Sequence, residues 1–111
     1  MSKPITPNEI DAVIHERARL SIVSALAGVA EMSFNELKSE LSLTDGNLSA
    51  HSRTLEEAGY IEVAKSFRKR RPLTTMRLTA KGRKAFRQYL TVLQQVLKEG
   101  KGTGDAKQKS R

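Results

Sequence analysis

Two groups of side chains in this 111-residue sequence have types and spacings that suit contact with a polyanion. Four consecutive cations, Arg68 to Arg71, lie in the segment KSFRKRRP, residues 65–72. Earlier, the segment TDGNLSAHSRT, residues 44–54, carries short side chains that donate and accept hydrogen bonds. Arginine and lysine bind phosphate oxygens, whereas asparagine, serine and threonine can bond base edges or phosphates. These residue types point to nucleic acid as a partner.

The net charge of +8 is unevenly distributed. Residues 1–62 hold five cations and ten acids, a net −5, whereas residues 63–111 hold fifteen cations and two acids, a net +13. From Val63 to Lys98 there are eleven cations and no acid. A one-signed stretch of this length indicates a polyanionic partner, with nucleic acid first and an anionic membrane second. The remaining interpretation is a surface that only keeps the protein soluble.

The composition argues against several other classes of protein. His15 and His51 are the only imidazoles and there is no cysteine, so one chain cannot build a disulfide or a His/Cys metal cluster, and we expect no metal and no cofactor. No set of nucleophile, base and orienting group emerges, so we expect no enzymatic activity. The N-terminal MSKPITPNEID lacks the apolar stretch of a signal peptide, and no apolar run approaches the ~20 residues of a membrane span. We expect a cytoplasmic protein without a membrane partner.

Local signals place the polar segment on the second helix of a helix-turn-helix. An S-x-x-E capping box at residues 33–36 predicts a helix that begins at Phe34 and stops near Ser42. Thr44 should cap a second helix, which should end at Gly59. Two short helices joined by a turn of three or four residues make a helix-turn-helix.

The outer face of this second helix is short, polar and mostly uncharged. An ordinary solvent-facing helix favours Glu and Lys, whereas short polar groups allow close approach to another surface. In helix-turn-helix proteins the N-terminal end of the second helix enters the major groove. We therefore predict DNA contacts from Thr44, Asn47, Ser49, Ala50, His51, Arg53 and Thr54.

After Gly59 the hydrophobic period changes to two. Residues 60–65 and 74–78 are typical of strands, and the cations between them form the connecting loop. A charged hairpin directly after a helix-turn-helix is a wing, whose tip can reach a minor groove or the adjoining phosphates. We predict wing contacts from Lys65, Arg68, Lys69, Arg70 and Arg71, with Pro72 stiffening the returning strand.

Helices are predicted on both sides of this unit. Residues 6–30 read as helical, with a break near His15–Arg17 into a short and a longer helix. Thr79 should cap a long helix, about residues 79–99, whose leucines form a seam. Since a helix after the wing has little left to pack on, the seam favours a homodimer over an intramolecular core. The predicted dimer interface comprises Ile10, Val13, Ile14, Phe86, Tyr89, Leu90, Leu93, Val96 and Leu97.

Three segments in combination resemble the winged-helix transcriptional regulators of the MarR/ArsR kind: LTDGNLS at 43–49, LEEAGY at 55–60 and LTAKGR at 78–83. The similarity covers about residues 15 to 90. It implies a homodimer that binds duplex DNA near a promoter, with a recognition helix from Thr44 and a wing at Arg68 to Arg71. MarR-like proteins can bind effectors between the DNA-binding and dimer regions, but this short chain leaves little volume for one, and a small-molecule effector stays unknown.

One position departs from that pattern. Ser52 follows His51 where the family usually has an apolar residue, most often leucine. By helical spacing from Leu48 it faces the core, so its hydroxyl needs a partner. The expected partner is a carbonyl of its own helical turn.

The sequence thus predicts one domain at residues 1–99 and a disordered basic tail at residues 100–111. The fold class is mainly α (α+β), a winged helix-turn-helix with a two-stranded β wing and a long C-terminal helix. The predicted function is that of a sequence-specific, double-stranded DNA-binding transcriptional regulator, acting as a dimeric repressor. A non-specific architectural nucleic-acid binder is one alternative, against which the uncharged helix face argues. A winged-helix protein-interaction module is another, against which the charged wing argues.

Overall fold

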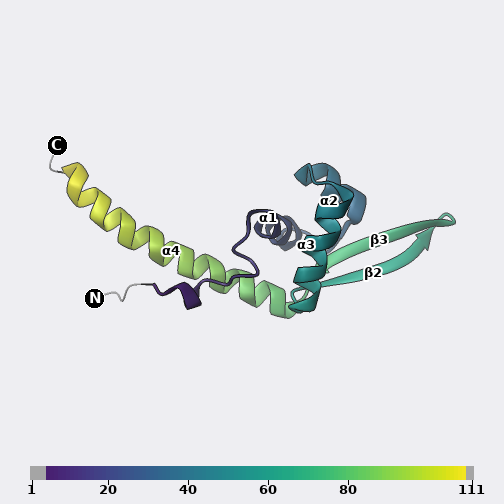
Figure 1. Ribbon diagram of the computed structural model, residues 1–111, viewed down its shortest axis with the longest axis horizontal. Coiled ribbons are helices and arrows are strands. Elements are labelled where there is room, and N and C mark those ends of the chain that lie inside the picture. The colour runs from purple at the N-terminus through teal and green to yellow at the C-terminus, as the bar shows by residue number, and fades with distance from the viewer. Residues whose placement is uncertain (1–4, 110–111) are drawn as a thin grey trace.

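The computed structural model describes the backbone of residues 5–109 and the side chains of residues 5–99. The molecule is elongated, measuring 65 × 27 × 23 Å, with three helices at its centre, a β-hairpin projecting from one end and a long helix leading away at the other (Figure 1). The predicted fold class, a winged helix-turn-helix with a β wing and a long C-terminal helix, is confirmed. The elements in chain order are η1 (Pro7–Glu9), α1 (Arg17–Ala27), β1 (Met32–Ser33), α2 (Phe34–Leu41), α3 (Asp45–Glu57), β2 (Ile61–Arg68), β3 (Arg71–Leu78) and α4 (Ala80–Lys109).

The three strands form an antiparallel sheet in the order β1-β3-β2. The register of β2 and β3 runs without a break from the Ile61–Leu78 pair at the base to the Arg68–Arg71 pair at the tip. Both strands are longer than predicted, because backbone pairing continues beyond the residues whose side chains alternate into the core. Strand β1 was not predicted; its two residues, Met32 and Ser33, pair with Met76 and Thr75.

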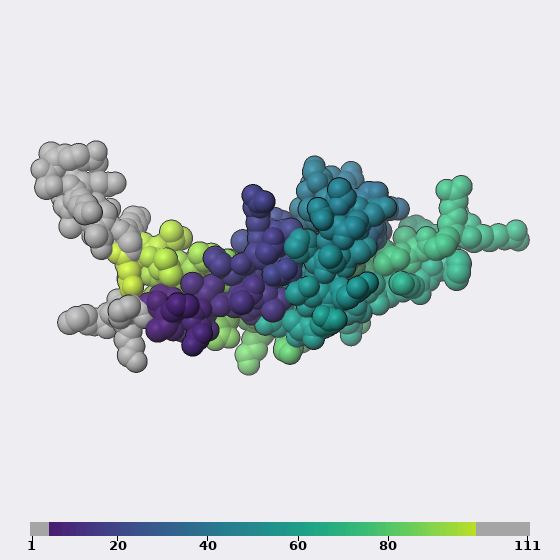
Figure 2. All heavy atoms as spheres, viewed as in Figure 1, coloured from purple at the N-terminus to yellow at the C-terminus, as the bar shows by residue number. Residues whose placement is uncertain are grey.

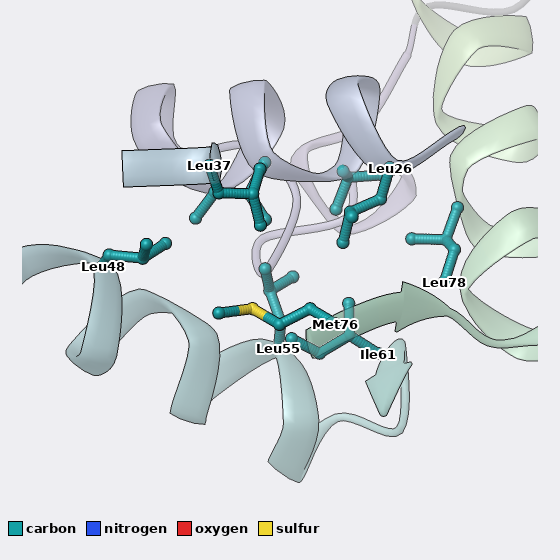
Figure 3. Close-up of a cluster of buried hydrophobic side chains, with 9 residues drawn as sticks. Leu26, Leu37, Leu48, Leu55, Ile61, Met76 and Leu78 are labelled. Carbon is teal, nitrogen blue, oxygen red and sulfur yellow. The ribbon is translucent and has the colours of Figure 1, made fainter. Parts of the chain in front are cut away.

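The hydrophobic core lies where α1, α2 and α3 meet the base of the β2–β3 hairpin. Leucines from each helix converge there, among them Leu26 of α1, Leu37 of α2 and Leu55 of α3, all fully buried (Figure 3). Met76 from β3 enters the middle of this cluster. The helix-turn-helix and the wing therefore share one core instead of folding as separate parts.

The short helix that the sequence predicted is reduced to the 3-10 turn η1, and residues 10–16 form a non-helical turn. The Asp11 carboxylate accepts hydrogen bonds from the backbone N–H groups of Val13 and Ile14, at 2.9 and 3.1 Å, which stabilises a turn. Its second oxygen accepts a 2.5 Å hydrogen bond from the Tyr60 hydroxyl. Helix α1 begins only at Arg17, after the predicted break, with Glu16 as its N-cap.

The junction of α3, the wing and α4 is built from close backbone contacts. Gly59, with φ of 81°, ends α3 in the left-handed conformation that glycine adopts readily. The Thr79 hydroxyl donates to the Gly59 carbonyl at 2.6 Å and accepts from the Gly82 N–H at 2.9 Å. A Cβ on Gly82 would collide with the Tyr60 carbonyl oxygen. Only glycine therefore lets the first turn of α4 dock against Tyr60.

Helix α4 begins at Ala80, directly after the predicted cap at Thr79, and runs to Lys109. Its backbone thus continues into residues 100–111, the segment predicted to be a disordered tail. The side chains beyond Glu99 and the last two residues lie outside the described part of the chain, and the disorder of that tail stays a prediction. Within the described residues, no helix is long and apolar enough to cross a bilayer.

The Tyr60–Asp11 contact predicts a pH-dependent loss of stability. Burial, together with the hydrogen bond to Asp11 and the charge of that carboxylate, raises the pKa of Tyr60 from 10.0 to about 12. A raised pKa favours the neutral phenol in the fold, so its contribution is complete below pH 10.0 and disappears as the pH rises to about 12. Tyr60→Phe should cost about 1 kcal/mol in urea unfolding near neutral pH, and the difference from the wild type should vanish in strong alkali.

The chain has two tyrosines, so a tyrosinate absorbance titration can follow the group directly. Tyr60→Phe should remove the component that ionises near pH 12. Asp11→Asn is the matched variant, because it keeps an acceptor and removes the charge; the late component should move toward the ordinary pKa of tyrosine. A Tyr60 that already ionises at its ordinary pKa in the wild type would contradict this account.

Candidate nucleic-acid interface

Helix α3 begins where the sequence predicted, because the Thr44 hydroxyl accepts a hydrogen bond from the Asn47 N–H at 3.1 Å. Asp45, in the first turn, forms an ion pair with Lys38 of α2 at 2.8 Å, which ties the two helices of the motif together. The N-terminal half of α3 keeps an open polar surface. The exposed members of the predicted set are Thr44, Asn47, Ser49, Ala50 and Arg53.

The other two predicted contact residues on α3 are partly engaged within the chain. The His51 ring lies against the start of α1, where Arg19 Nη1 is 3.2 Å from its Nδ1 and Glu16 Oε1 is 3.7 Å away. The backbone N–H of Arg19 donates to the Glu16 carboxylate and lowers its pKa. The Thr54 hydroxyl donates to the Ala50 carbonyl at 3.3 Å. The contacts of His51 with Arg19 and Glu16 therefore link α3 to the start of α1.

Ser52 is buried, as its spacing from Leu48 predicted, with 5% of its surface exposed. The expected partner was wrong: the hydroxyl donates to the Met76 sulfur of β3 at 3.4 Å, not to a carbonyl of its own turn. Thioether sulfur is a weak acceptor, so the contact satisfies the hydroxyl only modestly. This polar residue in the core thus links α3 to the wing.

The wing tip carries its charges on a strained turn. Lys69 and Arg70 are the two turn residues, with φ of 52° and 67°, and Arg68 pairs with Arg71 across the hairpin. Turns with two positive φ values normally take Asn-Gly, and an L-residue there costs roughly 1–2 kcal/mol. All four cations are exposed, at the tip as the sequence predicted. Backbone strain of this kind, at an exposed turn that carries charge, is typical of functional sites.

A groove of about 360 Å³ separates α3 from the wing. Ser49 and Arg53 line it from the helix, and Lys65 and Thr74, which pair across the hairpin, line it from the sheet. The groove therefore brings two predicted contact residues of α3 together with Lys65 of the wing. Thr74 was not predicted; its position opposite Lys65 follows only once the strand register is known.

The predicted dimer residues divide into three groups by their exposure in the single chain. Ile14 is fully buried and Tyr89 is 4% exposed within the single chain, so these two belong to its own core. The His15 ring bonds the Tyr89 hydroxyl at 2.8 Å. Leu90, Val96 and Leu97 remain 41%, 40% and 64% exposed. The residues that are partly buried instead are Ile10, Val13, Phe86 and Leu93.

Among the side chains of residues 5–99, no group of three or more His, Cys, Asp or Glu residues could hold a metal ion. The exposed residues of α3 and the wing offer hydrogen-bond donors, acceptors and cations. This combination suits binding of a nucleic acid.

The helix-turn-helix, the hairpin after it and their shared core define a winged helix-turn-helix protein. Residues 18–97 match the family described as winged helix DNA-binding domain, and the chain belongs to that family. An uncharacterized protein of Methanocaldococcus jannaschii is 41% identical over 86 residues, which cover 78% of this chain and 94% of that protein.

Solved structures agree with this assignment. A transcriptional regulator homologue from Pyrococcus horikoshii has a TM-score of 0.75 at 29% identity, covering 78% of this chain and 86% of its own. The transcriptional repressor BigR from Xylella fastidiosa has a TM-score of 0.57 at 26% identity, covering 72% and 75%. The resemblance to MarR/ArsR regulators is confirmed, and these matches are to transcription regulators, not to a class of enzyme.

The wing turn can be tested by giving it the sequence that its backbone prefers. The double variant Lys69→Asn/Arg70→Gly should stabilise the protein by about 1 kcal/mol, because it relieves two positive φ values. It should also weaken DNA binding and flatten the slope of log affinity against log salt by about 0.9 for each phosphate that the tip no longer neutralises. Thermal unfolding and a salt titration on duplex DNA measure the two effects.

The control, Lys69→Gln/Arg70→Gln, removes the same charges and leaves the strain. It should bind DNA as weakly as the Asn-Gly variant without gaining stability. Full retention of DNA affinity and salt slope in both variants would show that the tip cations contact something other than DNA.

Proposed function

We propose that this protein is a dimeric, sequence-specific DNA-binding transcriptional regulator that acts as a repressor. The observation that carries the proposal is the pairing of an exposed, mostly uncharged polar face on α3 with a strained, cation-bearing wing beside it. In this arrangement the first half of α3 lies in the major groove, where Asn47 and Ser49 meet base edges. The wing cations contact phosphates or the adjoining minor groove.

The wing and the exposed face of α3 have different proposed roles because their side chains differ in chemistry. Cations on phosphates supply affinity that does not depend on sequence, whereas amide and hydroxyl groups on base edges discriminate between base pairs. A purely architectural binder needs only the first of these. The mostly uncharged exposed face of α3 therefore supports specific readout, and a repressor role agrees with the name of the Xylella relative.

The direct test is binding of the purified protein to duplex DNA from upstream of its own gene, against unrelated competitor DNA at fixed salt. A specific regulator should prefer its site by a factor of ~10³ or more. A ratio close to one, with steep salt dependence, would instead identify a non-specific nucleic-acid binder.

Asn47 should carry part of the specificity. Its side chain lies on the exposed face in the first turn of α3, where a bidentate contact with adenine is possible. Asn47→Ala should cost roughly 1–3 kcal/mol on the preferred site and little on random DNA, as measured by fluorescence anisotropy. Asn35→Ala, the same change on the exposed face of α2, is the control and should discriminate as the wild type does. Equal losses on both DNAs would show that Asn47 only positions the helix.

The dimer proposal rests on the apolar surface that α4 leaves open. A groove of about 470 Å³ between α1, α2 and α4 is lined by residues such as Leu20, Leu41 and Leu93. Leu90, which also lines this groove, is exposed, and the exposed Leu97 follows Leu93 by four residues on the same face of α4. This apolar face is the surface that we propose meets a second copy. Exposed apolar surface of this kind marks an interaction site.

Leu97→Glu should produce a monomer with unchanged helical circular dichroism, because Leu97 is 64% exposed and contributes little to its own chain. Gln95→Glu adds the same charge on the opposite side of α4 and should leave the dimer intact. Sedimentation at micromolar protein concentration provides the measurement. A wild-type protein that is already monomeric would contradict the proposed dimer.

A further inference from the structure

The wing carries an exposed aromatic side chain. Phe67 lies on β2 two residues before the turn and is 77% exposed, the highest value among the exposed large hydrophobic residues of the described chain. Its cross-strand partner is Pro72, which is also exposed. These two apolar side chains are therefore neighbours near the end of the β2–β3 hairpin. The hairpin projects beyond the helices (Figure 2).

The strand register determines which way this pair faces. Side chains alternate along a strand, so Phe67 shares a face with Lys65, and Pro72 shares it with Thr74. Lys65 and Thr74 line the groove toward α3. The apolar pair therefore extends the side of the wing that faces the recognition helix, whereas Arg68 and Arg71, one residue closer to the tip on each strand, lie on the opposite side.

The charges around Phe67 select the kind of partner. Lys65 and Arg68 to Arg71 place five cations within seven residues, and the chain has no acid from Val63 to Lys98. A neutral protein surface would have to remove water from these cations without compensating them. Duplex DNA offers phosphates to the cations and base faces to the ring, and its minor groove accepts apolar wedges between base steps.

We propose that Phe67, supported by Pro72, is an apolar wedge that enters the minor groove beside the major-groove site of α3, partly unstacks one base step and bends the duplex. The wedge rests on the proposed DNA-binding function. It adds a specificity determinant at a position where the wing makes no hydrogen bond to a base. Pyrimidine–purine steps unstack most readily, so a TA or CA step is favoured there.

The test uses wild type and Phe67→Ala on one duplex of about 30 base pairs from the preferred site, with DNA bending read by energy transfer between labelled ends. Phe67→Ala should reduce the bend and weaken binding about tenfold, the size of one base–aromatic stacking interaction. The salt slope should not change, because every phosphate contact remains. Replacing the TA or CA step by a stiffer one should weaken the wild type and leave Phe67→Ala unaffected.

A second variant reports on the ring itself. The chain contains no tryptophan, so Phe67→Trp introduces a single indole, whose fluorescence should be quenched by stacking when the duplex binds. Val29→Trp places the indole at another exposed apolar position, 41% exposed in the turn after α1, and should not be quenched.

The outcomes separate this proposal from the proposed function. Specific DNA binding by the wild type, together with an unquenched indole in Phe67→Trp and an unchanged DNA bend in Phe67→Ala, would overturn the wedge. That result would leave the proposed regulatory function intact. Weaker self-association of Phe67→Ala with unchanged bending would place the ring in a protein contact and overturn the wedge as well. A wild type that shows no preference for any duplex would overturn both.

Discussion

The close approach of α4 to Tyr60 is the constraint on which the rest of the molecule depends. Because a Cβ at Gly82 would overlap the Tyr60 carbonyl oxygen, the two backbones are as near as glycine permits. Thr79 closes the same junction, because one hydroxyl bonds both the end of α3 and the start of α4. Helix α3, the base of the wing and α4 therefore meet at this junction in fixed relative directions. The proposed DNA surface and the proposed dimer surface are oriented by the same few atoms.

Away from this junction, the chain breaks local rules where it meets its proposed partner. Two cations occupy turn positions that favour Asn-Gly, an aromatic ring stands in solvent, and a helix face carries few of the charges that surfaces usually have. Each feature has a cost in the isolated protein, in strain, exposed apolar area or reduced solubility. At the base of the wing, in contrast, Glu62 and Arg77 pair in the ordinary way at 2.6 Å. The unfavourable features gather at the outer end of the wing and on α3.

Features determined by neighbouring residues could be predicted from the sequence. A capping box set the start of α2, a capping threonine set the start of α3, and a glycine set its end. Features determined by distant partners could not. Asp11 forms a turn that is held by Tyr60, 49 residues away, and Ser52 bonds Met76 on another element.

The long helix shows the same limit. In the sequence the apolar residues of α4 form one continuous seam. In the structure Tyr89 is buried within the chain whereas Leu97 is exposed. The extent of the core determines how far along α4 the packing continues, and the spacing of the seam does not reveal it. Phe67 was overlooked because its exposure depends on the hairpin register, which pairs it with Pro72 beyond the edge of the core.

The Ser52–Met76 contact couples α3 to the wing. Met76 belongs to β3 of the wing, and its side chain lies near Leu55 of α3, in the core cluster that also contains Leu48 (Figure 3). The helix and the hairpin are thus joined through a packed interior, and one cannot shift without disturbing the other. In the proposed complex, α3 and the hairpin would therefore span a fixed distance on the duplex. One base pair inserted between the two proposed contact points would move one of them by about 3.4 Å along the DNA axis and rotate it around that axis, so α3 and the wing could not reach both at once.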